Sequence, residues 1–148
     1  MENPVEDREQ LFTLDRRLAS DGVVIGDFPL SCALLMNDRR YPWVILVPRI
    51  AHVEELYQLS EADQVQLTKE LSFVASGLSE LFSADKVNIA ALGNIVRQLH
   101  VHVVVRFQDD PAWPGPVWGY GEREPYPDIV LSVMRERLAL AFAEQLEK

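Results

Sequence analysis

Two imidazoles, His100 and His102, stand two residues apart in the chain, and their type and spacing are suited to chemistry. Residues 97–106 have the composition of a strand, in which successive side chains point to opposite faces. Both imidazoles and Gln98 would then share one face, with the histidine Cα atoms roughly 7 Å apart. Because imidazole titrates near neutrality, such a pair could supply a nucleophile, a proton donor or metal ligands. The opposite face carries only apolar residues, which suits packing against a helix: Leu99, Val101, Val103 and Val105.

Residues 98–104 resemble the histidine triad (HIT) motif, His-φ-His-φ-His-φ-φ, in which φ is an apolar residue. Two of the three histidines match, and Gln98 stands in place of the first. Other segments in the family's order extend the resemblance over residues 10–108: Asn37 before a turn, a strand at 41–49 that ends in Val-Pro-Arg, a helix start at 54–60, a strand at 87–89 and the pair Gly93-Asn94.

The resemblance implies an α+β fold, an antiparallel sheet with helices packed on it, in one domain over residues 1–148. It implies a nucleotide hydrolase or transferase that acts on the α-phosphate of a dinucleoside polyphosphate, a phosphoramidate or an adenylate. By resemblance, the middle histidine of the motif, His100, attacks the phosphorus and forms a nucleotidyl-histidine, which water then hydrolyses. Family members need no cofactor here and are commonly homodimers whose two sheets join.

Further roles follow for residues that would bind the phosphate. His102 would donate to the phosphate or orient its neighbour. Gly93 and Asn94 could expose backbone N–H groups as a small anion-binding nest, although a plain hairpin turn explains this pair equally well. Asn88 could reach the phosphate from the neighbouring strand.

Asn37 would hydrogen-bond the nucleotide sugar, and apolar side chains near it, such as Leu35, would wall the base pocket. Two positions depart from the family pattern. Gln98 can hydrogen-bond the phosphate but cannot carry a proton, so a lost proton shuttle would slow the reaction by about 10²–10⁴-fold. Trp43 stands in a strand where many family members have a smaller residue or a histidine, which would reshape the pocket.

Two alternatives stay open. The first is a nucleotide-binding protein without turnover, which Gln98 makes credible. The second is a metal site, since His-x-His on one strand face suits zinc or iron. A metal would need a third ligand, for which His52, Asp109 or Asp110 could serve. We interpret His52 as a surface or capping residue.

Composition narrows the class of protein. A chain of 148 residues with 48% hydrophobic residues can bury a core as one domain. Its net charge of −9 argues against non-specific nucleic-acid binding. The single cysteine, Cys32, excludes an internal disulfide and lies in an apolar run, which predicts a buried thiol. The chain shows no signal-peptide pattern and no apolar run of the ~18 residues that a membrane helix needs, so we expect a cytoplasmic protein with no membrane partner.

Hydrophobic periodicity and turn residues predict the order of the elements. The sequence favours a helix at 4–19, strands at 23–27, 30–36 and 41–47, a long helix from Ser60 to 82, a strand at 86–92 and a last helix at 127–146. Residues 107–121 are rich in Pro, Gly and aromatic residues, which excludes a regular element. This loop could be a recognition lid, or Trp113 and Trp118 could plug the edge of the core.

Overall fold

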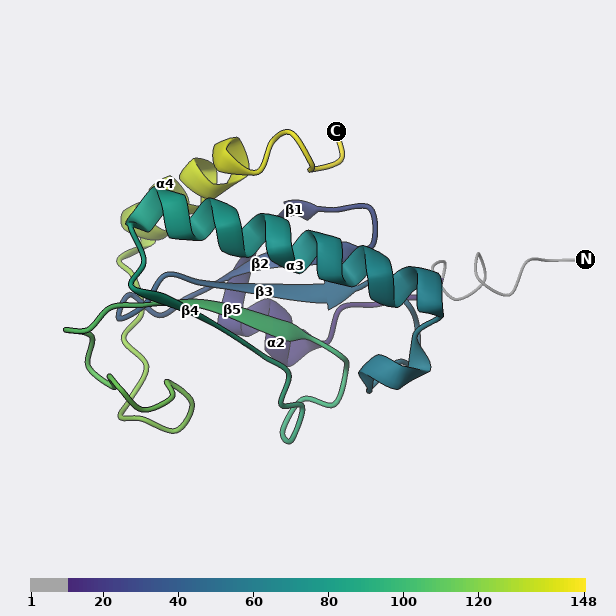
Figure 1. Cartoon of the computed structure of the whole chain (residues 1–148), viewed down its shortest axis with the longest axis horizontal. Helices are drawn as coiled ribbons and strands as arrows, with labels where there is room; N and C mark the ends of the chain where they lie inside the picture. The colour runs from purple at the N-terminus through teal and green to yellow at the C-terminus, as the bar shows by residue number, and fades with distance from the viewer. Residues whose placement is uncertain (1–10) are drawn as a thin grey trace, which may run out of the picture.

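The computed structural model describes residues 11–148 and has the mixed α+β architecture that the sequence predicts (Figure 1). Five strands form one sheet in the order β1-β2-β3-β5-β4, and every neighbouring pair is antiparallel. The strands are β1 (Gly22–Asp27), β2 (Ser31–Met36), β3 (Trp43–Pro48), β4 (Lys86–Ala90) and β5 (Val101–Arg106). The helices are α2 (Arg16–Asp21), the 3-10 turn η1 (Leu56–Gln58), α3 (Glu61–Phe82) and α4 (Asp128–Ala141).

Helix α3 is the long helix that the sequence predicts, and it begins at the expected cap. The Ser60 hydroxyl accepts a hydrogen bond from the backbone amide of Asp63 over 3.1 Å. This bond satisfies one of the amides that the first turn leaves without a partner, and acidic side chains in that turn complement the helix dipole. The helix lies across one face of the sheet (Figure 1) and buries Val74 and Leu78 against it.

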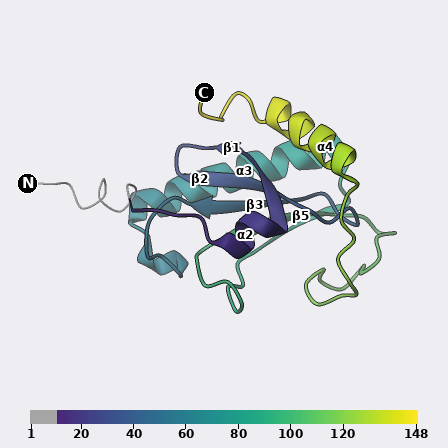
Figure 2. The same cartoon turned by 180° about the vertical axis from the view of Figure 1, so that it is seen from behind.

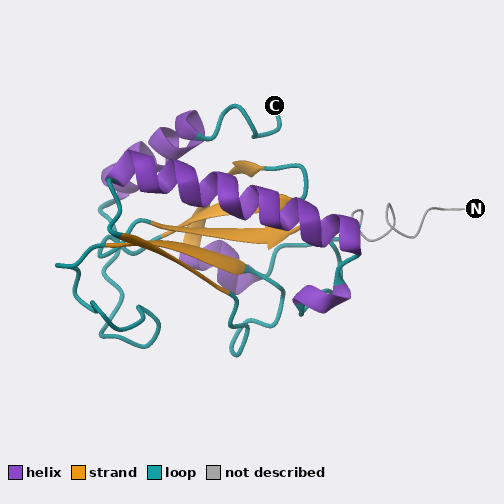
Figure 3. Ribbon diagram, in the orientation of Figure 1, coloured by secondary structure: helices purple, strands orange, loops and turns teal. Residues whose placement is uncertain are grey.

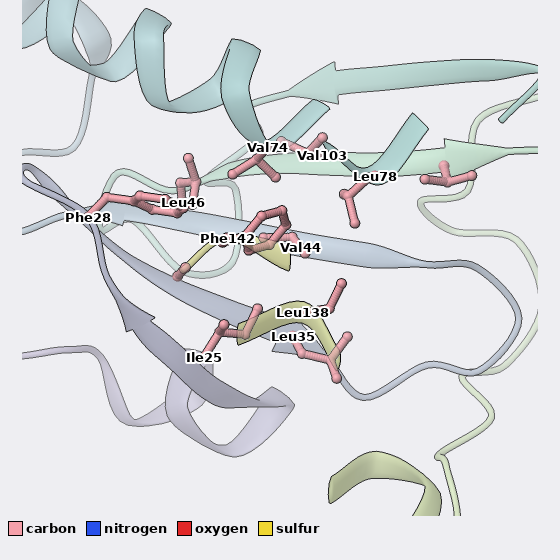
Figure 4. Packing of buried hydrophobic residues seen from close by; sticks show 12 residues of the cluster. Ile25, Phe28, Leu35, Val44, Leu46, Val74, Leu78, Val103, Leu138 and Phe142 are labelled. Carbon is pink, nitrogen blue, oxygen red and sulfur yellow. The ribbon is translucent and has the colours of Figure 1, made fainter. Parts of the chain in front are cut away.

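The main core lies between the sheet and helices α3 and α4 (Figure 4). Val44 and Leu46 of β3 and Val103 of β5 point into it, because alternate residues of a strand face the same side. Phe142, which follows α4, is fully buried there. Four apolar residues at helical spacing thus place the C-terminal helix on the sheet, as predicted: Leu131, Met134, Leu138 and Phe142.

A second cluster lies on the opposite face, which Figure 2 shows with α2 in front of the sheet. Trp43 and Ile45 of β3 and Val104 of β5 meet Leu18 of α2 in this cluster. Val117, Trp118 and other residues of the C-terminal loop complete it. The sheet is therefore covered on both sides, and the second face is the one that also carries His102.

The predicted N-terminal helix is only partly present. Residues 4–10 of the predicted helix at 4–19 lie outside the described residues, and residues 11–15 are not helical. Helix α2 begins at Arg16, because the Asp15 carboxylate accepts from the amide of Arg17 over 2.8 Å and caps the helix there. The helical spacing of Leu11 and Leu14 was therefore a misleading signal, since the main chain of Thr13 and Asp15 binds the Gln98 side chain instead.

Other boundaries also differ from the prediction. Strand β5 begins at Val101, so the predicted strand at 97–106 is shorter than expected and His100 ends the loop that precedes it. Strand β4 ends at Ala90 rather than at residue 92, and α4 ends at Ala141 rather than at 146. The alternation of faces is nevertheless as predicted, since Val103 and Val105 lie in the main core and Val104 lies on the opposite side.

Residues 107–121 form no regular element, as their composition predicts (Figure 3). The start of this loop is anchored by a buried ion pair, in which Arg106 Nε donates to Asp110 over 2.8 Å. The Asp110 carboxylate also accepts from the amides of Phe107 and Trp113. Burial alone would raise the pKa of Asp110, but these hydrogen bonds and the guanidinium charge outweigh it and lower the pKa. Within residues 11–148, no helix is both long and apolar enough to cross a membrane.

Candidate active site

A cavity of about 440 Å³ opens beside the second cluster. Its walls come from β3, from the loop between β4 and β5, from the start of β5 and from the C-terminal loop. Trp43, His102 and Trp118 form one side of it, and Gly93 and Asn94 belong to the loop that forms another. This volume lies in the range of pockets that hold small molecules, and both predicted imidazoles line it.

His100 is held by the backbone just before β5. Its Nδ1 atom lies 2.7 Å from the carbonyl oxygen of Gln98, and the side chain is 7% exposed. A carbonyl oxygen can only accept a hydrogen bond, so Nδ1 must carry the proton and donate it. In the neutral ring the Nε2 atom then has a free lone pair. His100 is therefore oriented as a nucleophile or as a base.

His102 is held by Trp43 from the neighbouring strand. The indole Nε1–H of Trp43 donates to Nδ1 of His102 over 3.0 Å. Indole has a donor and no acceptor, so Nδ1 of His102 must be unprotonated and the proton of the neutral ring sits on Nε2. Trp43 and Trp118 also pack edge-on against the imidazole, with ring centroids 5.6 and 5.4 Å away.

This environment keeps His102 uncharged. Burial, with a smaller contribution from the nearby His100, lowers the pKa of His102 from 6.5 to about 3. The two imidazole centroids are 5.0 Å apart. When the His100 ring is neutral, the site therefore presents one imidazole with a free lone pair beside a second imidazole, His102, that can only donate.

The loop that joins β4 to β5 lines the same cavity as these two histidines. Gly93 adopts φ +75°, a backbone conformation that favours glycine. Among the hydrogen bonds within residues 11–148, none has the backbone amide of Gly93, Asn94 or Ile95 as donor. These residues lie in the loop from Ala91 to His100 rather than in a tight hairpin turn, and the anion-binding nest at Gly93 and Asn94 stays a prediction.

Comparison with known proteins gives the family. The HIT domain family matches residues 17–109, which include the sheet, α3 and both histidines. The chain belongs to the HIT family.

Solved HIT proteins resemble the whole described chain. A histidine triad protein from Sinorhizobium meliloti 1021 is 50% identical to this chain, with a TM-score of 0.84. The match covers 93% of this chain and 99% of the other. A histidine triad protein from Marinobacter aquaeolei VT8 is 46% identical, with a TM-score of 0.88. That match covers 90% of this chain and 98% of the other. Diadenosine triphosphate hydrolase from Plasmodium falciparum shares the fold at 14% identity, with a TM-score of 0.64. Here the match covers 93% of this chain and 84% of the other. No curated protein matches the chain.

Three polar residues that the HIT resemblance singled out lie outside the cavity lining. The Asn37 carboxamide oxygen accepts from the amide of Tyr126 over 2.9 Å. The Asn88 oxygen accepts from the guanidinium of Arg106 over 2.8 Å. These two oxygens therefore anchor the C-terminal segment and the buried arginine.

Gln98, the third of these residues, binds the N-terminal segment. Its side-chain oxygen accepts from the amide of Asp15, and its side-chain nitrogen donates to the carbonyl of Thr13, each over 2.9 Å. Its backbone carbonyl is the acceptor for His100, so Gln98 acts on the site through its main chain.

One predicted wall of the HIT pocket is wrong. Leu35 points into the main core and is 1% exposed, because it alternates with the residues that face the other side of β2. Met36, the next residue, lines the cavity instead. The sequence does place Trp43 in the pocket correctly, but nothing local in the sequence shows that Trp118 meets it there, at a centroid distance of 6.0 Å.

Two arginines that the sequence did not predict as site residues line the cavity, and each is paired with an acid. Arg40 lies 2.8 Å from the buried carboxylate of Asp38 and also donates to the carbonyl of Tyr120. Arg123 lies 3.2 Å from Asp21 in an exposed pair. The positive charges of these two arginines are therefore balanced by Asp38 and Asp21.

The residues that the metal hypothesis needed as a third ligand are not gathered around the two histidines. Asp110 is committed to Arg106, and His52 is exposed with φ +64°. Over the part of the chain that the structure describes, no group of three or more His, Cys, Asp or Glu residues could hold a metal ion.

Proposed function

We propose that this HIT protein is a nucleotide hydrolase or transferase that acts on a nucleotide α-phosphate through a nucleotidyl-histidine on His100. The observation that carries the proposal is the bond between His100 Nδ1 and the carbonyl of Gln98, which leaves the Nε2 lone pair available in the cavity. Covalent catalysis of this kind divides one difficult displacement into two easier steps.

In the first step, His100 Nε2 attacks the α-phosphorus, and the bond from phosphorus to the leaving group breaks. The Nε2–H of His102 and the amides of residues 93–95 donate to the phosphate oxygens, where negative charge is concentrated. In the second step, water attacks the phosphorus, the P–N bond breaks and the neutral imidazole departs. The hydrogen bond from His100 Nδ1 to the Gln98 carbonyl stabilises the positive charge that the ring carries in between.

From the resemblance of residues 98–104 to the motif, we infer that Gln98 stands at the position of the first triad histidine. Since its side chain binds Thr13 and Asp15, we propose that this position supports the loop before His100 rather than moving a proton. The Asn37 side-chain nitrogen makes no hydrogen bond within residues 11–148, so its contact with the nucleotide sugar stays a prediction, as does the contact of Asn88 with the phosphate.

A nucleotide substrate is consistent with the fold and with one structural neighbour, which is described as a diadenosine triphosphate hydrolase. Aromatic and apolar walls at Met36, Trp43 and Trp118 suit a nucleoside. The second candidate is a nucleotide-binding protein without turnover, and the absence of a proton-carrying side chain at Gln98 favours it.

The experiment combines nucleotide release with binding. Wild-type protein is mixed with diadenosine triphosphate, and AMP release is followed by chromatography while AMP binding is measured by calorimetry. We expect release to fall at least about a hundredfold in His100→Ala and to be unchanged in His52→Ala, a histidine outside the cavity. Binding of AMP without release in the wild type would assign the protein to the binding class. A wild type that shows neither release nor binding would contradict the proposal.

The cytoplasmic location stays a prediction. We also propose that the protein is a homodimer formed through β4. Strand β4 is an edge of the sheet, and its Ile89 side chain is 49% exposed. The other edge, β1, is partly covered, because Arg135 and the amide of Glu147 donate to its carbonyls. Light scattering should give a dimer mass for the wild type and a monomer mass for Ile89→Lys, while a monomeric wild type would contradict this.

A further inference from the structure

The proposed reaction needs a proton only for some leaving groups. A phosphate or a carboxylate departs as a stable anion, with the electron pair of the broken bond on its oxygen. An amine that leaves a phosphoramidate must instead receive a proton on nitrogen as the P–N bond breaks. A cavity with a side chain that can give this proton can therefore act on phosphoramidates, and a cavity without one favours substrates with a phosphate or carboxylate leaving group.

His102 lies beside His100, with the two ring centroids 5.0 Å apart, and its geometry excludes the role of proton donor to the leaving group. Its Nδ1 accepts the Trp43 indole proton over 3.0 Å. A second proton on His102 would have to sit on that same atom, where two N–H groups would then point at each other. The neutral ring can donate a hydrogen bond from Nε2 but has no acidic proton to transfer near neutrality.

The other polar groups around the cavity offer no better acid. Asp38 is ion-paired with Arg40, and Asp21 is ion-paired with Arg123. A carboxylate that pairs with a guanidinium accepts hydrogen bonds and has no proton to give. Tyr120 lines the cavity with 49% of its surface exposed, and a phenol is a weak acid at neutral pH.

Gln98 and His100 also cannot supply a proton to the leaving group. The side chain of Gln98 is bonded to Thr13 and Asp15, and a carboxamide cannot release a proton in any case. The proton on His100 Nδ1 is held by the carbonyl of Gln98, on the far side of the ring from the attacking nitrogen. It serves the second step, where it allows the ring to leave as neutral imidazole.

We propose that this site acts on nucleotides whose α-phosphate carries a phosphate or carboxylate leaving group, and that it discriminates against phosphoramidates because Trp43 holds His102 as a neutral donor. This inference rests on the proposed function. It makes Trp43 a positioning residue, which acts on the reaction only through His102. The low pKa of His102, about 3, agrees with the geometry.

The test compares two substrates that share a nucleotide and differ in the leaving group. Quenched-flow mass spectrometry would measure adduct formation on the full chain from diadenosine triphosphate and from adenosine 5′-phosphoramidate at pH 7. We expect the phosphoramidate to react about 10²–10⁴-fold more slowly, the usual contribution of a general acid. Rates within tenfold of one another would overturn the inference while leaving the proposed function intact. No adduct from either compound would overturn both.

A variant pair tests the role of Trp43. Trp43→Phe keeps an aromatic ring but removes the indole N–H, so His102 can take a second proton. We expect the phosphoramidate rate of this variant, relative to the triphosphate rate, to rise as pH falls from 8 to 5. The matched control is Trp113→Phe, since Trp113 packs on Arg106 and does not line the cavity, and its ratio should stay at the wild-type value. A ratio in Trp43→Phe that does not change with pH would contradict the positioning role.

Discussion

The side-chain oxygen of Gln98 accepts a hydrogen bond from the backbone amide of Asp15 over 2.9 Å, across 83 residues of sequence. Its side-chain nitrogen donates to the carbonyl of Thr13 over the same distance. The residue whose carbonyl orients His100 is thus fixed to the segment that leads into α2. Stability of the N-terminal segment and orientation of the proposed nucleophile are connected through one side chain.

Replacing Gln98 by alanine removes both hydrogen bonds and leaves the main-chain carbonyl in place. We expect the free energy of unfolding to fall by about 1–2 kcal/mol, from two bonds of ordinary strength. The rate of AMP release should change by less than tenfold, because no proton passes through this side chain. Urea unfolding and the release assay would be run together with Gln108→Ala, an exposed glutamine, as control. A loss of activity without a loss of stability would show that Gln98 takes part in the chemistry.

The ion pair between Arg106 and Asp110 should matter much more for stability. Both side chains are 2% exposed, so Asp110→Asn would leave a buried guanidinium without its counterion. The expected cost is about 3–5 kcal/mol in the free energy of unfolding. Asp109→Asn, the same change at an exposed neighbour, should cost little. Equal midpoints of urea unfolding for the two variants would contradict this assignment.

Much of the fold could be predicted from local sequence, because its elements are determined by local signals. The Ser60 cap, the apolar stripe of α3 and the continuous apolar run of β3 are such signals, and each produced the predicted element. The N-terminal helix was overestimated because residues 11–15 have helical spacing but bind Gln98, a contact that no local pattern reveals.

The site was predictable in part for the same reason. His102 lies in the cavity because the alternation of a strand is a local property, and His100 lines the same cavity from the residue just before β5. The partner of His102 is Trp43, 59 residues away, and Trp118 comes from an irregular loop. Asn37 and Asn88 carry no mark in the sequence that shows which group their side chains bind. Their observed partners, Tyr126 and Arg106, became visible only in the folded chain.

Buried His102 should make stability depend on pH. Its pKa is lowered from 6.5 to about 3, so below pH 6.5 the unfolded chain binds a proton that the folded chain does not. Its contribution to stability is complete above pH 6.5 and is lost as pH falls toward 3, by up to about 1.4 kcal/mol for each pH unit. Urea unfolding of the wild type at pH 7 and pH 5 should show this loss, and His102→Gln should show a smaller one. An equal loss of unfolding free energy between pH 7 and pH 5 in the two proteins would mean that the pKa of His102 is not lowered by folding.

The thiol of Cys32 should be inert in the folded protein. Burial, together with the nearby Asp27, raises its pKa to about 11, and the side chain is 7% exposed. At pH 8 only about one thiol in a thousand would be ionised, and the thiolate is the reactive form. A colorimetric disulfide reagent should therefore react slowly with the native chain and completely in urea. Rapid reaction of the native protein would show that β2 opens more readily than its packing indicates.

The central claim is that the nucleotide is transferred to His100, and peptide mapping tests it most directly. Wild-type protein would be mixed with diadenosine triphosphate, quenched within milliseconds to seconds under conditions that preserve P–N bonds, digested and analysed by mass spectrometry. We predict an added adenylyl group on the peptide with residues 98–106, located on His100, and no such adduct in His100→Ala. Steady AMP release without an adduct at His100, or an adduct located on His102, would contradict the account.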